Sequence, residues 1–419
     1  MGGSAWHHRP SGTAAAVLAC VLVVVEAGPA LAAPGDLDPS FGTGGTVTTA
    51  FTGGGFASAV AIQGDGKIVV VGSAAGSSGK GEFAVARYGT DGSLDPTFDG
   101  DGMVTTPIAG GGDEATSVAI QPNGRIVVAG TDSRERFAVV RYRADGSLDA
   151  TFGGDGIVRT NLTRGDDIGL DMALQPDGKI VVAGPAGSPS RFALVRYRRD
   201  GSLDETFGDG GEVFGRRGIL RALALQPDGR IVVTGYDAYG LTVARYLPDG
   251  TPDPAFGEGG AVRRVAIEIF PLEVAVQPNG RILVGGDYDI FAFGLARFRA
   301  DGRLDTSWSG NGIARTRVVQ GAEQAITALV VQTDGKIVAA GYAAPHEADS
   351  EIVPSFALAR YLRSGRLDTS WGGDGKVSTS FAEGVTARGA AAQPDGAIVV
   401  VGAASQGTSV SFALARYLA

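Results

Sequence analysis

Two ionisable residue types recur along the whole sequence at a fixed spacing, and they are the first candidates for chemistry. An arginine lies near the end of a Phe-Ala-x-Ala-Arg-Tyr segment, and an aspartate follows shortly after it in an Asp-Gly-Ser-Leu-Asp segment. The arginines are Arg87, Arg141, Arg196, Arg245, Arg297, Arg360 and Arg416, and the aspartates are Asp38, Asp95, Asp149, Asp204, Asp253, Asp305 and Asp368. A ring of functional charges is one interpretation. Because the same pair recurs seven times, we favour structural ion pairs that tie together two parts of each repeat.

The sequence is poor in the residues that nucleophilic and metal chemistry need. It has three histidines, of which only His346 follows the first 33 residues, and a single cysteine, Cys20. A Ser–His–Asp triad or a zinc site would therefore lack most of its usual members. Acidic glycine turns such as residues 99–102 and 153–156 lack the oxygen spacing of an EF-hand loop, so turn chemistry explains them and calcium is the alternative. We expect no metal site and no cofactor.

These residues belong to a repeat that accounts for nearly the whole chain. The segment Gln-Pro-Asp-Gly-Lys-Ile-Val-Val-x-Gly, or a close variant of it, occurs seven times, with starting residues 51 to 61 apart. The starting glutamines are Gln63, Gln121, Gln175, Gln226, Gln277, Gln332 and Gln393. A period in this range is typical of repeat architectures. The glycine count of 67 agrees with many short strands joined by tight turns.

Each copy predicts four strands. A short alternating run precedes the glutamine, the Pro-Asp-Gly turn follows, and an apolar strand comes next. The Phe-Ala-x-Ala-Arg-Tyr strand is third, and at a period of two its phenylalanine and arginine share one face while its small alanines and tyrosine share the other. A Gly-x-Val-x-Thr run forms the fourth, outer strand. A large face opposite a small face is what adjacent radial sheets need to interdigitate.

One copy is split between the two ends of the sequence. The seventh copy stops at Tyr417-Leu418-Ala419, before its Leu-Asp segment, and the missing piece is found at residues 37–49. This arrangement allows a ring to be closed by one strand from each end. The sequence therefore predicts an all-β fold: a seven-bladed β-propeller with four-stranded antiparallel blades, closed by pairing of the N-terminal segment with the C-terminal blade.

The repeat resembles the delta-60 repeat family of bacterial proteins. The resemblance rests on the glutamine turn, the Phe-Ala-Leu-Ala-Arg-Tyr strand and the Asp-Gly-Ser-Leu-Asp-x-Thr-Phe-Gly segment, and it covers about residues 36–419. More loosely, the unit is similar to the NHL propeller repeat, whose first strand lines the central channel. The resemblance implies a propeller that is usually exported and has no established biochemical activity.

The first 33 residues have the pattern of an export signal. A polar start with His7 and His8 is followed by an apolar run and by Ala30-Leu31-Ala32, which suits cleavage. We therefore expect a signal peptide at residues 1–33, a single propeller at 34–419 and a secreted, extracellular protein. Lipoprotein anchoring at Cys20 is the alternative. The net charge of −9 argues against nucleic acid, and we expect a monomer without a membrane span.

Variation between copies is concentrated in the second-to-third and fourth-to-first connections, which emerge on one face of the ring. Binding residues usually lie on loops held by a rigid scaffold. The most distinctive loops carry Tyr236, Asp237 and Tyr239 in one copy and Asp287, Tyr288 and Asp289 in the next. These aromatic faces and acceptors suit sugar rings or a peptide. The leading hypothesis is a non-catalytic scaffold that binds a glycan, cell-wall polymer or protein partner through this face.

Two other functions stay open. A carboxylate-based hydrolase or lyase acting on polysaccharide needs only two acids at the right separation. Candidate acids lie in loops of the same face: Asp113, Glu114, Asp166, Asp167, Glu268 and Glu323. The third hypothesis is a purely structural module of the cell surface, which would have no specific soluble ligand.

Overall fold

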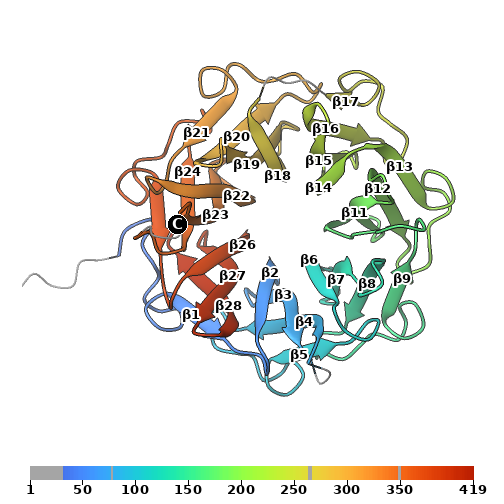
Figure 1. Ribbon diagram of the computed structural model, residues 1–419, viewed down its shortest axis with the longest axis horizontal. Helices are drawn as coiled ribbons and strands as arrows, with labels where there is room; N and C mark the ends of the chain where they lie inside the picture. Colours follow the sequence, from blue (N-terminus) through green and yellow to red (C-terminus); the bar gives the residue numbers. More distant parts are fainter. Residues whose placement is uncertain (1–31, 77–78, 263–266, 348–350) are drawn as a thin grey trace, which may run out of the picture. The chain divides into compact units, whose positions relative to one another are not determined.

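The computed structural model describes residues 32–76, 79–262, 267–347 and 351–419, and these residues form a ring of seven four-stranded antiparallel sheets. Figure 1 shows the sheets arranged as blades around a central channel. The predicted seven-bladed propeller is confirmed. Residues 1–31 of the predicted 1–33 signal segment, Cys20 among them, lie outside the described residues. No helix in the described ranges is long and apolar enough to cross a membrane.

Every blade has the same strand order from the channel outward. The inner strands are β2 (Gly55–Ile62), β6 (Glu114–Ile120), β10 (Asp171–Leu174), β14 (Ile219–Leu225), β18 (Ile269–Val276), β22 (Ala322–Val331) and β26 (Val385–Ala392). The second strands are β3 (Ile68–Ala75), β7 (Ile126–Thr131), β11 (Ile180–Ala186), β15 (Ile231–Asp237), β19 (Ile282–Tyr288), β23 (Ile337–Pro345) and β27 (Ile398–Gln406).

The two remaining strands of each blade lie toward the rim. The third strands are β4 (Gly81–Tyr88), β8 (Phe137–Tyr142), β12 (Arg191–Tyr197), β16 (Gly240–Tyr246), β20 (Ala292–Phe298), β24 (Ser355–Tyr361) and β28 (Ser409–Tyr417). The outer strands are β5 (Met103–Thr106), β9 (Ile157–Thr160), β13 (Glu212–Arg217), β17 (Ala261–Val262), β21 (Ile313–Thr316), β25 (Lys376–Thr379) and β1 (Thr46–Thr49).

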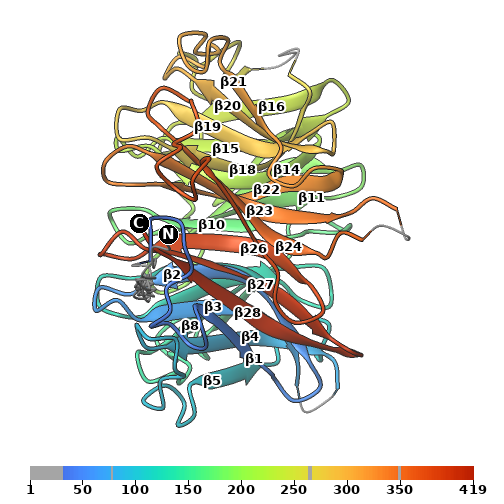
Figure 2. The ribbon, with the colours of Figure 1, turned by 90° about the vertical axis from the view of Figure 1, so that its left-hand side faces the viewer.

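The seventh blade is the split one. Its order is β26-β27-β28-β1, so the outer strand comes from the other end of the chain. Thr46 lies opposite Ala415 and Thr49 opposite Phe412, and Leu37 forms a further bridge to Tyr417. Figure 2 shows β1 and β28 side by side. The predicted ring closure is therefore confirmed.

The hydrophobic core lies between successive blades. Val85 and Phe83 of β4 pack against the second blade, whereas Ala84, Ala86 and Tyr88 pack against the seventh. The third strand thus presents its large side chains to one neighbour and its small ones, with the tyrosine, to the other, as the period-two pattern predicts. Burial on both faces explains why each second strand begins with an apolar run.

Repeated polar contacts join the blades around this core. The Tyr88 hydroxyl donates to Thr49 Oγ1 at 2.8 Å, from the first blade to the outer strand of the seventh. The side-chain amides of Gln226, Gln332 and Gln393 donate to a glycine carbonyl in the turn of the following blade, and the Gln393 bond, to Gly66 at 3.1 Å, spans the ring closure. Buried polar groups need such partners, so these residues recur with the repeat.

The strand directions divide the loops between two faces. The Gln-Pro-Asp-Gly and Leu-Asp turns lie on one face, which we call the repeat-turn face. The fourth-to-first and second-to-third connections lie on the other, which we call the variable face. Inner strands begin at the variable face and run toward the repeat-turn face.

Candidate functional site

A β-bulge recurs in the inner strands and determines which side chains enter the channel. In β6, pairing with β7 passes from Ala115 directly to Ser117, so Thr116 has no partner residue. The same shift occurs five residues before the glutamine in β2, β14, β18, β22 and β26. In the third blade, β10 begins just after the corresponding residue, Leu170. Because a bulge interrupts the alternation of side chains, two consecutive residues line the channel.

A glycine on the second strand makes room for each bulge. At Gly130, a Cβ atom would collide with the carbonyl oxygen of Glu114 on the inner strand. In all seven blades, a Cβ atom at the equivalent glycine would collide with the equivalent carbonyl oxygen of the inner strand. These glycines are Gly72, Gly130, Gly184, Gly235, Gly286, Gly341 and Gly402. The last glycine of the Lys-Ile-Val-Val-x-Gly segment is therefore a packing requirement of the bulge.

The residues at and after the bulge line a pocket of about 670 Å³ in the channel, which we call the central pocket. Its lining belongs mainly to the first half of the inner strands, so it lies toward the variable face. The bulge residues are Ser58, Thr116, Leu170, Arg221, Leu272, Thr327 and Arg388, and the next residues are Ala59, Ser117, Asp171, Ala222, Glu273, Ala328 and Gly389. The volume is in the range of pockets for drug-sized ligands.

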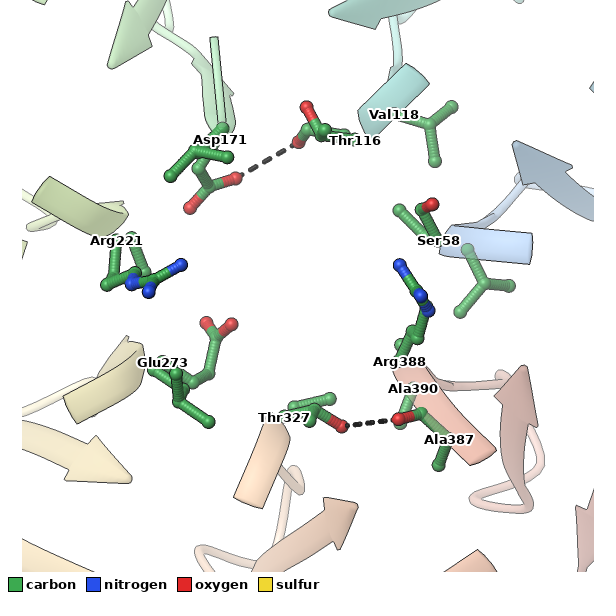
Figure 3. A pocket seen from close by; sticks show the side chains of 18 of the residues that line it. Ser58, Thr116, Val118, Asp171, Arg221, Glu273, Thr327, Ala387, Arg388 and Ala390 are labelled. Atoms are coloured by element: carbon green, nitrogen blue, oxygen red, sulfur yellow. Dashed lines mark hydrogen bonds between the residues drawn. The ribbon is translucent and has the colours of Figure 1, made fainter. Parts of the chain in front are cut away.

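Four charged side chains stand out in this ring of mostly small residues. Figure 3 shows Arg221 between Asp171 and Glu273 on one side of the channel, with Arg388 on the opposite side. The two acids come from the third and fifth blades, and the arginines from the fourth and seventh. The central pocket therefore combines acidic, basic and hydroxyl groups around one cavity.

Asp171 is held firmly by its neighbours. Its carboxylate accepts hydrogen bonds from the Ser117 hydroxyl at 3.0 Å, from its neighbour Met172 N at 2.7 Å and from Leu223 N at 2.8 Å. Burial raises the pKa of Asp171 to about 6, against the opposing effect of these hydrogen bonds. The carboxyl group is thus poised to change its charge just below neutral pH.

Glu273 is the second acid of the pocket. Burial, followed by the nearby charge of Asp171, raises its pKa well above the ordinary value for glutamate. In the described part of the chain, no ion pair is formed by either carboxylate. Two interacting acids with raised pKa values in a cavity are a typical feature of functional sites.

The two arginines connect the pocket to aromatic side chains. The Arg221 guanidinium lies 5.7 Å from the Tyr236 ring and 5.8 Å from the Phe270 ring. These two rings pack against each other with centroids 4.4 Å apart and planes tilted by 44°. Arg388 lies 4.6 Å from the Phe56 ring, and its Nη1 is 3.8 Å from Glu114 Oε1. Phe270 is 38% exposed. Tyr236 and Phe270 therefore form an aromatic platform beside Arg221.

The structure places the predicted loop residues around the pocket rather than in it. Of the six, Tyr236 lies in the aromatic platform and Tyr288 packs against Arg315, whose guanidinium is 4.8 Å from its ring. Asp289 pairs with the same arginine, and Asp237 accepts from Tyr239 N within its own turn. Asp287 lies within β19, opposite Phe270 and Phe293, and Tyr239 lies in the turn between β15 and β16. None of the six is among the residues that line the central pocket.

The predicted rival acids are dispersed, and Glu114 is the one that lines the central pocket. Asp113 is buried and accepts from Ile108 N and Ser133 N, which is a structural role. Glu323 Oε1 lies 2.6 Å from Nδ1 of His346, whose imidazole is exposed. The other acids, Asp166, Asp167 and Glu268, do not line the pocket either.

The pocket residues have a sequence signal that the loop-based prediction missed. They occupy the fifth and fourth positions before the glutamine, where the repeats carry Arg, Asp or Glu in place of Ser, Thr, Leu or Ala. Charges at a position that is otherwise small or apolar mark Asp171, Arg221, Glu273 and Arg388.

The recurring arginines and aspartates lie away from the pocket, near the repeat-turn face. Arg141 Nε is 2.8 Å from Asp149 Oδ2, and the guanidinium also donates to the Arg199 carbonyl of the next blade and lies over the Phe152 ring. Pairs of this kind join Arg87, Arg141, Arg196, Arg245, Arg297, Arg360 and Arg416 to Asp95, Asp149, Asp204, Asp253, Asp305, Asp368 and Asp38, respectively. They tie strands within a blade and blades to one another.

A second cation joins most of these pairs. In the first blade, Lys67 Nζ lies 3.1 Å from Asp95 Oδ2, and in the sixth Lys336 Nζ lies 3.1 Å from Asp368 Oδ2. Burial alone would raise the pKa of Asp368, but the Ser370 hydroxyl, Lys336 and Arg360 outweigh it and lower the pKa to about 2. Across the described ranges, no group of three or more His, Cys, Asp or Glu side chains could hold a metal ion.

The sequence matches the family model described as "Domain of unknown function (DUF5122) beta-propeller" at residues 63–98, 121–152, 175–207, 226–256, 277–307, 332–370 and 393–419. The chain belongs to this family. The seven matches of this DUF5122 propeller begin at the seven glutamines. The match confirms the predicted resemblance to a family of propeller repeats.

Solved structures of similar fold include proteins of different activities. The BP39L lectin from Burkholderia pseudomallei gives a TM-score of 0.56 at 13% identity, covering 89% of the DUF5122 propeller and 97% of the lectin. A catalytically inactive virginiamycin B lyase from Staphylococcus aureus, solved with quinupristin, gives 0.52 at 9% identity, covering 88% and 98%. At these identities the likeness shows the fold alone. Among curated proteins, no sequence relative is detected.

Proposed function

We propose that this protein is a non-catalytic binding propeller that takes the end of a glycan chain into the central pocket from the variable face. One observation carries the proposal. Seven blades repeat nearly the same residues, yet the bulge residue and the residue after it, two of the positions that line the pocket, differ from blade to blade and include Asp171, Arg221, Glu273 and Arg388. A scaffold alone would have no use for this variety.

The chemistry of the pocket suits a hydroxyl-rich ligand. Sugar hydroxyls both donate and accept hydrogen bonds, so they complement a cavity with carboxyl, guanidinium and hydroxyl groups. The Tyr236–Phe270 platform offers an apolar surface for the face of a sugar ring. A lectin is among the solved propellers of similar fold, and this likeness is compatible with a glycan ligand. The predicted export signal would place the protein where envelope and extracellular glycans occur.

A glycan and cell-wall array on the purified protein tests the proposal, with each hit followed over time for turnover. Glu273→Gln, Arg388→Met and Tyr236→Ala should each weaken binding about tenfold or more, as expected for lost charge-assisted hydrogen bonds or stacking. Arg303→Ala is the matched control, because Arg303 is a highly exposed arginine on the repeat-turn face. The proposal would be contradicted if the protein bound no glycan on the array, or if none of the three pocket variants weakened the binding that is observed.

The acid pair favours a second candidate function, a carboxylate-based hydrolase or lyase acting on polysaccharide. In that case Glu273, kept protonated by burial, would donate a proton, and the more readily ionised Asp171 would act as the base or nucleophile. The array separates the two functions. Turnover that Glu273→Gln abolishes while binding persists would assign catalysis, whereas binding without turnover in the wild type supports the scaffold.

A purely structural module is the remaining alternative. It predicts no specific soluble ligand and no effect of the pocket variants on any binding measurement.

A further inference from the structure

We propose that a second site, at the rim of the third blade, binds an acidic glycan through three arginines and one exposed aromatic ring. The site is a cleft of about 600 Å³ on the variable face, separate from the central pocket and not dependent on its proposed function. We call it the arginine cleft. Arg191 and Arg217 of its lining belong to β12 and β13, which Figure 1 labels.

The arginines of the cleft come from three different segments. Arg164 lies in the loop between β9 and β10, Arg191 begins β12, and Arg217 ends β13. All three are exposed, and Phe214 between them is 41% exposed. The lining has no acidic side chain, and in the described residues none of these arginines forms an ion pair. In a chain of net charge −9, such a local excess of positive charge is unusual.

Two of the arginines are direct neighbours across a strand pair. Arg191 lies opposite Arg217 at the end of the β12–β13 ladder, next to a register shift. Like charges directly opposite each other in a sheet destabilise it. A like-charge pair that lowers stability without an anion present is a typical feature of a binding site.

The acids of the neighbouring loop are directed elsewhere. Asp167 is buried and accepts from Leu162 N, Thr163 N and the Thr163 hydroxyl, so its charge is used inside the loop. Asp166 shares a hydrogen bond with Glu135 and raises the pKa of that glutamate. The loop therefore presents Arg164 to the cleft without presenting its own carboxylates.

The combination of groups specifies the ligand class. Planar guanidinium groups bind carboxylates with two parallel hydrogen bonds, and three of them can hold successive charges of a polymer. The exposed Phe214 ring offers a surface for the apolar face of a sugar. A chain of uronic acid residues presents both features, a carboxylate and a ring face in each unit.

Calorimetry with oligogalacturonate tests this at low salt, with a neutral glucan oligomer of the same length and inorganic phosphate as comparison probes. We expect oligogalacturonate to bind, the neutral oligomer to bind at least tenfold more weakly, and the affinity to fall as salt rises. Each of Arg164→Gln, Arg191→Gln and Arg217→Gln should weaken oligogalacturonate binding about tenfold, the loss expected for one charge-assisted contact. Phe214→Ala should weaken oligogalacturonate binding and leave any phosphate binding unchanged.

Two controls separate this site from a general loss of positive charge and from a structural role. Arg303→Gln on the repeat-turn face should leave oligogalacturonate binding unchanged. Without ligand, Arg217→Gln should melt at the same temperature as the wild type or higher, because it relieves the repulsion from Arg191. Equal binding of acidic and neutral oligomers, unchanged binding in the triple arginine variant, or a lower melting temperature for Arg217→Gln would each overturn the proposal. If only the central-pocket variants lost glycan binding, the proposal for the arginine cleft would still stand.

Discussion

Gly130 of the second blade lies directly against the carbonyl oxygen of Glu114 on the adjoining inner strand, and no side chain fits between them. This contact recurs in every blade and permits the bulge that places two consecutive residues in the channel.

Gly130→Ala should therefore destabilise the protein, because the new methyl group forces the inner strand away from its partner. We expect a loss of about 2–3 kcal/mol in the free energy of unfolding, as for other overpacked sites. Urea denaturation measures it. The control is Gly64→Ala, where nothing lies near the added atom and the backbone is not left-handed, so stability should be unchanged or slightly higher. Equal stability of the two variants would show that the bulge does not depend on the glycine.

Deletion of residues 37–49 should lower the melting temperature sharply, because the seventh blade loses its outer strand and the core beside it. A point variant tests the same packing more gently. Val47 packs against the core between the seventh and first blades, whereas Thr48 is exposed on the same strand. Val47→Asp should lower the melting temperature by several degrees and Thr48→Asp hardly at all. An unchanged melting temperature in the deletion would refute the role of β1 in ring closure.

Asp149→Ala should cost about 3–5 kcal/mol of stability, chiefly because it leaves the buried Arg141 without its partner. Asp149 is fully buried, and Arg141 is 5% exposed. Glu205→Ala removes an exposed acid from the equivalent segment of the next blade and should be nearly neutral. Chemical denaturation at neutral pH compares the two. A small cost at Asp149 would mean that the pair is dispensable to the scaffold.

The same pairs predict a loss of stability in acid. The pKa of Asp368 is lowered to about 2 in the folded state. The contribution of this carboxylate to folding stability is therefore present above about pH 4, its pKa in the unfolded state, and is lost as the pH falls through about 2. Melting temperatures of wild type and Asp368→Asn should therefore converge between pH 4 and pH 2. A constant difference over that range would contradict the linkage.

The acid pair of the central pocket predicts the opposite trend at higher pH. Burial raises the pKa of Asp171 to about 6. The contribution of this residue to folding stability is therefore fully present below about pH 4, the pKa of the unfolded state, and is lost as the pH rises through about 6. The melting temperature of Asp171→Asn should therefore rise relative to that of the wild type as the pH increases from 4 to 7. The melting temperature of Glu273→Gln should change in the same direction. Glu205→Gln should follow the wild type throughout. Parallel curves for all four proteins would show that the two acids are not perturbed in the fold.

Much of the architecture can be predicted from the sequence because it rests on repetition. The seven glutamines fix the number of blades, the Phe-Ala-x-Ala-Arg-Tyr alternation fixes which faces pack, and residues 37–49 complete the blade that Tyr417 leaves unfinished. Each of these inferences needs only local periodicity and counting.

The site was harder to predict because it depends on one unpaired residue per inner strand. By simple alternation, the side chains of Arg221 and Ala222 should point to opposite faces of the strand, but the bulge lets both residues line the pocket. The partners of the loop residues depend on the angle between blades, which no local pattern gives. Tyr236 was predicted as a binding residue, yet its packing against Phe270 of the next blade and its contact with Arg221 emerge only in three dimensions.

The split blade also orders events during synthesis. β1 is made before any complete blade, but its partner β28 is the last strand of the propeller to be made, so β1 has no strand to pair with until the seventh blade exists. The six continuous blades can form as the chain grows, whereas the seventh can form only after β28 has been made. A chain that terminates before β28 would therefore keep open strand edges, which can pair with other chains. Joining the first and last strands makes synthesis of all seven blades a condition for a closed, protected ring.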